Sequence, residues 1–521
     1  MRGVVGYQAK SLSDGSVGLS RCDRGILVAA TVTTWGDAID WLLRPPAGSD
    51  PVFTVCFSLY DFSKALFSLL PPDERKRIEG GEDRVFFEDC KVFYVGGRYL
   101  GLTATIPVNP DANQYRRVEL NLQALKWWVS EDEDEPADAK EVWTLGARIV
   151  KALDGMGFQP TKLTSPVAVF ADCYLGDARK YPTIFSWPEE KLEALQYAEE
   201  LMRFEWRSAY QVGYFQETHL WDRVSAYPAA IRDLPSTDDC RCEHSETVPD
   251  WAQWGVMYGE VQVDVDVSPL VFDMGDGTRI NPKGRWKGCF TTGEIKWLDK
   301  WGAGRFTMED GWFFRFGKER PYRVATDWLF TRKQSPDTFL SGIARKASQG
   351  LSGKLDEDRQ DGKKGDYYNP VLACMVRSQC RLRVADFIYQ NKLQPDLIAV
   401  LVDSVLATSA VDLPESEGTG RMGSWRYEGL TPAVVLSKGA IWRPGKRPQG
   451  ISYEALLDAL KGAPGSAYYE FVLPSGTKRS IDLMLDGSDL DRNFGQYPET
   501  GADVLSRVVG STAIEIGREN E

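Results

Sequence analysis

Histidine is scarce in this sequence, since only His219 and His244 occur among 521 residues. A mechanism built on a histidine base, or a zinc site made of several histidines, is therefore disfavoured. Long apolar runs are absent as well, and none approaches the roughly 20 residues that cross a bilayer. The segment Met1–Gly25 contains no apolar signal core, so we expect neither a membrane span nor secretion.

The nine cysteines lack regular spacing, which favours a reduced, intracellular protein. Cys240, Cys242 and His244 lie within a short stretch, but no second cluster completes a tetrahedral zinc site, so zinc is the weaker interpretation. The net charge of −13 argues against a uniformly basic surface for nucleic acid. It leaves room for a local basic groove on an acidic protein. The composition therefore directs the search for chemistry towards carboxylates.

The chain is long enough for three or four domains at about 150 residues each. Its hydrophobic content of 43% is ample for buried cores. An α/β pattern runs from Arg21 to about Tyr181, a helix starting at Ser186 links it to a second domain, and that domain begins near Phe204. The sequence predicts strands over 25–33, 52–60 and 256–272, and hairpins over 94–105 and 397–407. It predicts a helix over 142–156, a helix that starts at 291–295, two helices over 320–355 around Pro336, and a helix capped by Asn369.

Two isolated aspartates stand where strands are expected to end. Asp222 opens the stretch Asp-Arg-Val-Ser-Ala-Tyr-Pro, which follows an aromatic run, and Asp403 lies between two apolar runs. Magnesium prefers oxygen ligands and is usually held by one or two carboxylates plus substrate phosphates. Such a pair can catalyse in-line nucleotidyl transfer. The alternative is structural: a strand end with a Tyr-Pro turn, and a tight turn between two strands.

The order of motifs resembles that of family B DNA polymerases, especially the protein-primed phage, plasmid and organellar branch. The resemblance extends from about Tyr210 to Trp442. The family's first palm motif, Asp-x-x-Ser-x-Tyr-Pro, matches residues 222–228 in full. It implies that Asp222 binds both magnesium ions, with the backbone of Val224 as a further ligand. It also implies that the nucleotide lies against Ser225, Ala226 and Tyr227, with the tyrosine excluding a ribose 2′-hydroxyl.

The family's third motif, Tyr-x-Asp-Thr-Asp-Ser, corresponds to residues 399–404. Leu401 stands where the family has its first aspartate, whereas Asp403 keeps the second, which is the main metal ligand. The resemblance therefore implies Asp222 and Asp403 as the catalytic, metal-binding pair. The missing acid and tyrosine predict reduced efficiency.

The family's second motif lies on a fingers helix and corresponds to residues 345–354. Arg345 replaces the lysine that grips the triphosphate, and Ser352 replaces the tyrosine that floors the base-pair pocket. The charge is kept, but with the fork geometry of a guanidinium. A solvated basic helix face is the alternative. The implied nucleotide contacts are Arg332, Arg345, Lys346, which could compete with Arg345, and Gln349; the implied DNA contacts are Tyr210, Gly213, Lys354 and Lys438.

The resemblance places a proofreading exonuclease fold at the N-terminus, and that activity needs an Asp-x-Glu on the first strand. The strand that we equate with it, Gly25–Thr33, contains no acid. Asp61 and Asp138 are the remnants that we match to the second and third exonuclease motifs. Two metal ions cannot be held on what remains. We therefore expect a domain that keeps the fold and guides DNA without proofreading.

The fold expected is a multidomain α/β and α+β protein. An RNase H-like, exonuclease-type domain would precede a right-hand polymerase with an antiparallel-sheet palm, helical fingers and a small thumb. The expected boundaries are 1–205 for the exonuclease-like domain, 206–300 for the first palm part with an insertion, 301–356 for the fingers, 357–412 for the second palm part, and 413–521 for the thumb and C-terminal region.

The expected function is DNA-directed DNA synthesis that adds dNTPs to a 3′-hydroxyl without proofreading. The expected cofactors are two Mg²⁺ ions, with Mn²⁺ as a substitute, and the partners are primer-template DNA and dNTPs. A terminal protein primer is left open, and we expect a monomer in the cytoplasm of a bacterial host, encoded by a phage or plasmid. The alternative function is a catalytically weak or inactive relative that binds DNA as a replication accessory module.

Overall fold

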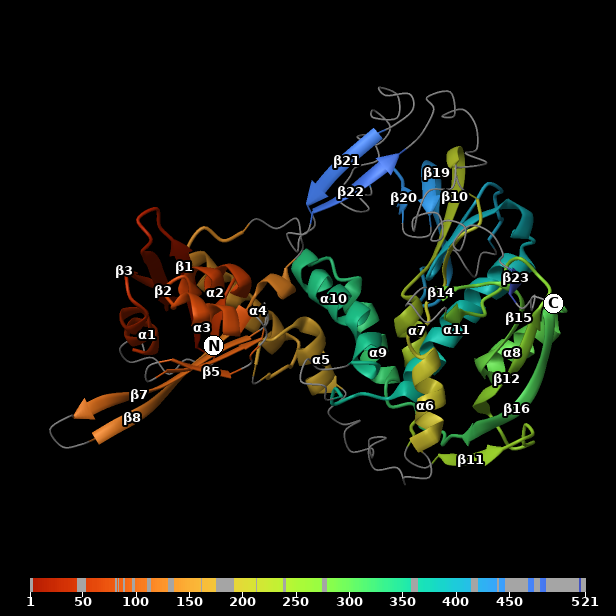
Figure 1. The fold of residues 1–521 in the computed structure, drawn as a ribbon, viewed down its shortest axis with the longest axis horizontal. Helices are drawn as coiled ribbons and strands as arrows, with labels where there is room; N and C mark the ends of the chain where they lie inside the picture. The colour runs from red at the N-terminus through yellow and green to blue at the C-terminus, as the bar shows by residue number, and fades with distance from the viewer. Residues whose placement is uncertain are drawn as a thin grey trace. The chain divides into compact units, whose positions relative to one another are not determined.

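The computed structural model divides the chain into two compact units, one of residues 1–178 with 327–351 and the other of 179–326 with 352–521. Figure 1 shows the helices and strands of both units. The residues described are 3–44, 53–79, 82, 84–87, 90–95, 99–109, 114–129, 135–160, 162–174, 192–211, 213–237, 240–273, 279–357, 364–413, 420–437, 440–445, 467–472, 478–483 and 515–516.

The first unit is built on an eight-stranded sheet in the order β3-β2-β1-β4-β8-β7-β6-β5. β1 is parallel to β4 and β4 to β8, while the other neighbours are antiparallel. The strands are β1 (Val4–Ser11), β2 (Val17–Asp23), β3 (Ile26–Val32), β4 (Phe53–Cys56), β5 (Arg84–Phe87), β6 (Cys90–Val95), β7 (Tyr99–Asn109) and β8 (Gln114–Ala124).

Helices pack on this sheet at close range. A Cβ atom on Gly6 of β1 would lie 2.5 Å from the backbone nitrogen of Trp143, so only glycine lets α4 approach the strand this closely. Lys346 on α10 donates to the carbonyl of Val129, and Trp328 on α9 packs edge-on against Phe158. The helices are α1 (Trp35–Leu43), α2 (Leu59–Phe67), α3 (Pro72–Glu79), α4 (Ala139–Gly155), α5 (Pro166–Tyr174), α10 (Thr338–Leu355) and most of α9 (Arg323–Lys333), with a 3₁₀ turn, η2, at Lys126–Trp128.

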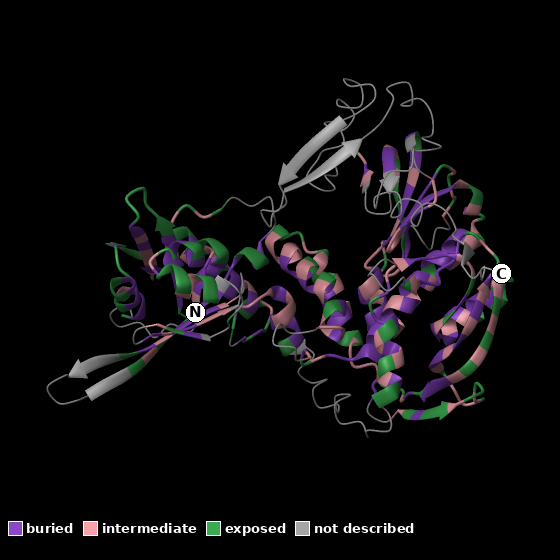
Figure 2. Ribbon diagram, in the orientation of Figure 1, coloured by how far each residue is buried: buried purple, intermediate pink, exposed green. Residues whose placement is uncertain are grey.

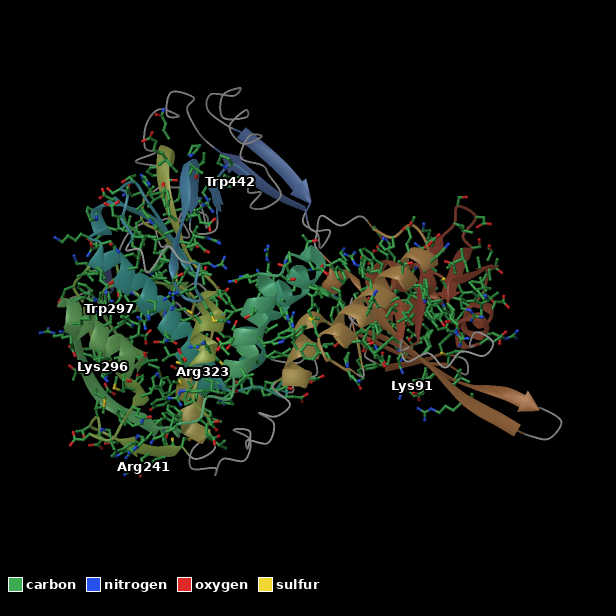
Figure 3. The ribbon with its side chains drawn as sticks, turned by 180° about the vertical axis from the view of Figure 1, so that it is seen from behind. Lys91, Arg241, Lys296, Trp297, Arg323 and Trp442 are labelled. Carbon is green, nitrogen blue, oxygen red and sulfur yellow. The ribbon has the colours of Figure 1, made fainter. Side chains whose placement is uncertain are left out.

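The second unit contains a six-stranded antiparallel sheet in the order β20-β19-β10-β18-β17-β9. Both of its faces are buried, with Trp221 and Val405 in one hydrophobic cluster and Leu220 and Leu406 in another, and Figure 2 shows the burial along these strands. Trp442 lies on the edge strand β20 (Figure 3) and is fully buried. The strands are β9 (Arg207–Ala209), β10 (Gly213–Arg223), β17 (Leu397–Leu401), β18 (Ser404–Ala407), β19 (Trp425–Ser437) and β20 (Ala440–Trp442).

A five-stranded sheet in the order β11-β16-β12-β15-β23 adjoins helix α8 within this unit. Three of its strands fall within residues 206–300, where the first palm part with an insertion is expected. Its strands are β11 (Arg241–Ser245), β12 (Trp254–Val263), β15 (Lys283–Thr291), β16 (Gly304–Arg315) and β23 (Glu515–Ile516); short hairpins are β13 (Phe272–Asp273) with β14 (Arg279–Ile280) and β21 (Ala467–Val472) with β22 (Lys478–Leu483).

A buried ion pair joins two helices of the second unit. Arg381 on α11 donates to Glu294 on α8 and to the carbonyl of Phe204, and Glu294 also accepts from the backbone and hydroxyl of Thr291. The charges are thus paired and hydrogen-bonded, as burial requires. The helices are α6 (Leu192–Leu201), α7 (Ala226–Arg232), α8 (Thr292–Trp301) and α11 (Pro370–Gln390), with the 3₁₀ turn η6 at Gln394–Asp396.

Most of the expected elements are confirmed, including the capping of α11 by Asn369 and a helix, α8, that starts in the segment 291–295 and has a capping box at Thr291. The helix start at Ser186 lies outside the described residues. The strand expected over 256–272 is too long, because β12 ends at Val263. No helix in the described parts of the chain is long and apolar enough to cross a bilayer.

The prediction that residues 25–33 form the first strand of the N-terminal domain is wrong. The strand over 25–33 is β3, at the edge of the sheet, and the first strand of the domain is β1 in its interior. Glycine and polar residues interrupt the apolar pattern of β1 and β2, so the sequence pattern did not predict these strands. β1 also contains no acid, and the loss of proofreading stays a prediction for this domain.

Candidate active site

Asp222 is positioned by three adjacent strands. It lies near the end of β10, opposite Ser404 on β18 and Arg426 on β19. The Ser404 hydroxyl donates to Oδ1 of Asp222 at 2.7 Å, and Nη2 of Arg426 lies 3.7 Å from Oδ2. The carboxylate is therefore oriented by one hydrogen bond and one exposed cation. Strand β19 falls within the range 413–521 that the sequence assigned to the thumb, yet it belongs to this sheet.

Asp403 lies in the tight turn between β17 and β18. Its amide donates to the carbonyl of Leu401 at 2.8 Å, and its carbonyl accepts from the amide of Arg223 at 3.0 Å. The amide of Val402 donates to the carbonyl of Trp206 at 2.8 Å. The turn is thereby fixed on both sides, and it places Asp403 beside the end of β10 and next to Asp222.

The two aspartates interact electrostatically. Burial, and then the negative charge of Asp222, raise the pKa of Asp403 from 3.8 to about 6, while the Arg223 guanidinium acts in the opposite direction. Two neighbouring carboxylates disfavour simultaneous ionisation unless a cation joins them. This donor set fits a hard divalent ion such as Mg²⁺. No group of three or more Cys, His, Asp or Glu side chains suited to a metal occurs among the described residues, so the site rests on this pair.

The turn before Asp403 contains backbone strain. Val402 has a φ of 66°, a region that β-branched residues rarely occupy. Such strain costs on the order of 1–3 kcal/mol and is concentrated at functional sites. We expect Val402→Gly to relieve it and to raise the free energy of unfolding by about 1 kcal/mol.

Urea denaturation of the wild type and the variant measures this change. Val405→Gly provides a matched control, because Val405 is buried in the regular strand β18 and its truncation must destabilise. A loss of stability in Val402→Gly would contradict the assignment of strain.

The residues after Asp222 form a sharp corner into helix α7. Ser225 adopts the left-handed conformation, with φ 52° and ψ 51°, and the buried Ala226 is the first residue of the helix. The amide of Val224 donates to Ser424 at 2.9 Å, and its carbonyl accepts from Gly423 at 2.7 Å. The carbonyl predicted as a metal ligand thus has one hydrogen bond and retains a second lone pair.

Tyr227 lies within a group of charged side chains that sequence reasoning missed. Its hydroxyl donates to Oε1 of Glu205 at 3.2 Å, and the guanidinium of Arg377 lies 4.9 Å from its ring centroid. Glu205 precedes β9 and Arg377 is on α11, so no local motif connects them with Tyr227. Only their opposite charges and the aromatic ring between them could have hinted at the contact.

The nucleotide contacts predicted from the second motif and the helix before it lie on α9 and α10, in the other unit. Arg332 and Arg345 are exposed, as is Gln349. Arg332 stands over the ring of Trp328 at 5.2 Å. The ammonium of Lys346 donates to the carbonyl of Val129, so of the neighbouring cations Arg345 is the more accessible one.

The predicted DNA contacts have varied surroundings. Tyr210 is partly buried against the core, and its hydroxyl accepts from Nε1 of Trp206 at 3.2 Å. Gly213 begins β10, and Lys354 forms an ion pair with Glu357 at 2.7 Å. Lys438 lies outside the described residues.

The two aspartates that the sequence matches to exonuclease motifs lie at helix starts. Asp61 is exposed in the first turn of α2. Asp138 is the N-cap of α4, and its Oδ1 accepts from the amides of Lys140 and Glu141 at 2.8 and 2.9 Å. Both positions are ordinary for aspartate at a helix start, and within the described residues they belong to no metal-binding group. The same finding covers Cys240, Cys242 and His244.

The arrangement of these sheets and helices is shared with solved structures of a DNA polymerase. No protein-family model and no curated protein sequence matches the chain. Solved structures of phi29 DNA polymerase do match it. The complex with primer-template DNA (post-translocation binary complex) has a TM-score of 0.62 at 11% identity and covers 93% of this chain and 100% of that chain. The ternary complex with primer-template DNA and incoming nucleotide substrates has a TM-score of 0.60 at 10% identity, over 93% and 99%.

Proposed function

We propose that this protein is a DNA-directed DNA polymerase that adds dNTPs to a primer 3′-hydroxyl. The observation that carries the proposal is the pairing of Asp222 and Asp403 at the ends of neighbouring strands, within the fold of phi29 DNA polymerase. The first palm motif is intact around Asp222, and the ordered series of family B motifs supports the protein-primed branch.

The protein side chains would act mainly by orientation. Ser404 holds one oxygen of Asp222, and the tight turn holds Asp403 beside it. Both carboxylates would bind two Mg²⁺ ions, or Mn²⁺ in their place, with the carbonyl of Val224 as a further oxygen ligand. When bound, the ions lower the pKa of the attacking 3′-hydroxyl and neutralise charge on the phosphates. The protein contributes fixed geometry, so little reorganisation accompanies transfer.

The proposal does not include proofreading. β1 and β3 contain no acidic side chain, Asp61 lies in the first turn of α2 and Asp138 caps α4, and no metal-binding group of acidic side chains occurs in the described part of the first unit. We propose that this unit guides DNA without hydrolysing it. In a 3′-labelled primer assay without dNTPs, we expect no shortening beyond the level of a protein-free control.

Primer extension tests the main proposal. Purified protein, a labelled primer-template and Mg²⁺ should yield templated extension when the four dNTPs are added, and chelation of the metal should stop it. Failure to incorporate any nucleotide while DNA is bound would overturn the proposal. It would favour the second candidate, an inactive DNA-binding accessory module, which Leu401 in place of an acid and the cation Arg426 beside Asp222 support.

Arg345 and Lys346 are expected to contribute differently to dNTP affinity. Because Lys346 is engaged by the carbonyl of Val129 while Arg345 is exposed, we expect Arg345→Ala to raise the KM for dNTP roughly tenfold, as expected for one charged contact. Lys346→Ala is the matched variant and should change KM less than threefold. Steady-state incorporation measures both, and the reverse order would contradict the assignment.

Primer-template DNA and dNTPs are the proposed partners, and phi29 DNA polymerase has been solved with both. From the resemblance to the protein-primed branch we also propose that a protein hydroxyl can serve as the primer. Extension that requires a DNA or RNA 3′-end would count against protein priming. We propose further that the protein is a monomer in a bacterial cytoplasm and is encoded by a phage or plasmid.

A further inference from the structure

The ring of Tyr227 is held between two charged side chains. Its hydroxyl donates to Oε1 of Glu205 at 3.2 Å, and the Arg377 guanidinium lies 4.9 Å from the ring centroid. The same guanidinium donates to Glu205 at 2.6 Å and to Asp356 at 3.0 Å. Burial raises the pKa of the Tyr227 hydroxyl, so the hydroxyl remains a proton donor at neutral pH.

This arrangement is rigid in a way that a surface tyrosine is not. The Arg377 side chain is 12% exposed and that of Asp356 is 15% exposed. A guanidinium held by two carboxylates has little freedom, and its planar face can rest against an aromatic ring. The second oxygen of Glu205 lies 3.5 Å from Arg207, which fixes the carboxylate as well.

The segment around Glu205 also contacts the catalytic turn. The carbonyl of the next residue, Trp206, accepts from the amide of Val402, and the charge of Glu205 contributes to the raised pKa of Asp403. One short segment therefore supports both the tyrosine and the turn with the metal-binding acid. A shift of Tyr227 relative to the metal-binding acids would require this segment to move.

We propose that Glu205 and Arg377 are positioning residues that fix Tyr227 and thereby set the discrimination between deoxyribonucleotides and ribonucleotides. The proposal rests on the proposed polymerase function, which gives Tyr227 its place beside the sugar. With its proton directed to Glu205, the hydroxyl is not available to donate to a ribose 2′-oxygen. With its ring held by Arg377, the side chain cannot turn aside to admit that oxygen.

The test compares incorporation of a dNTP and the matching rNTP in single turnovers on one primer-template. We expect Glu205→Gln and Arg377→Lys each to lower the wild-type preference for dNTP roughly tenfold, because each loses a charged hydrogen bond. Glu243→Gln is the matched control, since Glu243 forms an exposed ion pair with Arg241 on β11, and it should leave the preference unchanged.

A double-mutant cycle separates positioning from a general loss of structure. If Glu205 acts through Tyr227, by its hydroxyl or by the Arg377 guanidinium on its ring, Tyr227→Ala already removes its effect, so Tyr227→Ala combined with Glu205→Gln should match Tyr227→Ala alone within about twofold. Additive effects of the two substitutions would overturn the proposal. So would an unchanged preference in both Glu205→Gln and Arg377→Lys.

A binding measurement distinguishes failure of this proposal from failure of the function. Affinities for dATP and ATP are measured on the protein bound to a template with a dideoxy-terminated primer, where no transfer occurs. Extension by the wild type with an unaltered dATP-to-ATP ratio in the variants overturns the positioning role alone. Absence of both extension and nucleotide binding overturns both.

Discussion

Asp222→Asn should abolish nucleotide incorporation, with a loss of at least roughly 10³-fold in the single-turnover rate. The substitution keeps the size of the side chain and its contact with Ser404, but it removes the negative charge that would hold the metal ions. Metal ions supply several kcal/mol of transition-state stabilisation, and each 1.36 kcal/mol corresponds to a tenfold change in rate.

The control for this variant is Asp250→Asn, because Asp250 is an exposed aspartate of the same unit. It should extend primers at the wild-type rate. Circular dichroism and primer-template affinity should be alike in all three proteins, which separates lost chemistry from lost folding or DNA binding. Full activity of Asp222→Asn would contradict the assignment of the catalytic pair.

Asp403→Asn should have opposite effects on activity and stability. It should reduce incorporation as strongly as Asp222→Asn, because the second carboxylate is also lost. In metal-free buffer at pH 8, however, it should raise the free energy of unfolding by about 2–3 kcal/mol. That figure is the conversion of a pKa raised from 3.8 to about 6 into free energy.

The sign follows from the direction of the shift. The folded state disfavours the charged form of Asp403, so this group destabilises the wild type progressively as pH rises from about 4 to about 6 and fully above that range. Below about pH 3 the carboxyl is protonated in both states and the difference between wild type and variant should vanish. Chelator-treated protein unfolded in urea at pH 3 and pH 8 measures both ends.

Added Mg²⁺ should reduce the difference in free energy of unfolding between Asp403→Asn and the wild type at pH 8, because a cation bound to the folded wild type stabilises it. A variant that is less stable than the wild type at pH 8 would show that Asp403 is stabilised by its neighbours. That result would contradict the mutual repulsion on which the metal site is argued.

Local patterns predicted much of the fold. The helix start at residues 291–295, the cap of Asn369, the hairpin around Asp403 and the pair of helices around Pro336 are properties of short segments, and the structure confirms them. The DNA polymerase fold itself followed from the order of the motifs, and the structural comparison supports it.

Long-range contacts could not be predicted from those patterns. The placement of β19 beside β10, and of Glu205 and Arg377 around Tyr227, depends on packing between segments far apart in sequence. β1 was missed because glycine and polar residues interrupt its apolar pattern, although it is buried in the interior of its sheet. The first and third sequence motifs identified Asp222 and Asp403 as candidates. The electrostatic interaction between their carboxylates could be inferred only from the geometry of the turn.

The most direct test is a crystal structure of the protein with primer-template DNA, a non-hydrolysable dNTP analogue and Mn²⁺. Anomalous scattering locates the manganese ions independently of the protein density. The account predicts at least one anomalous peak within coordination distance of carboxylate oxygens from both Asp222 and Asp403. A ternary complex whose manganese peaks contact neither aspartate, or only one of them, would contradict it.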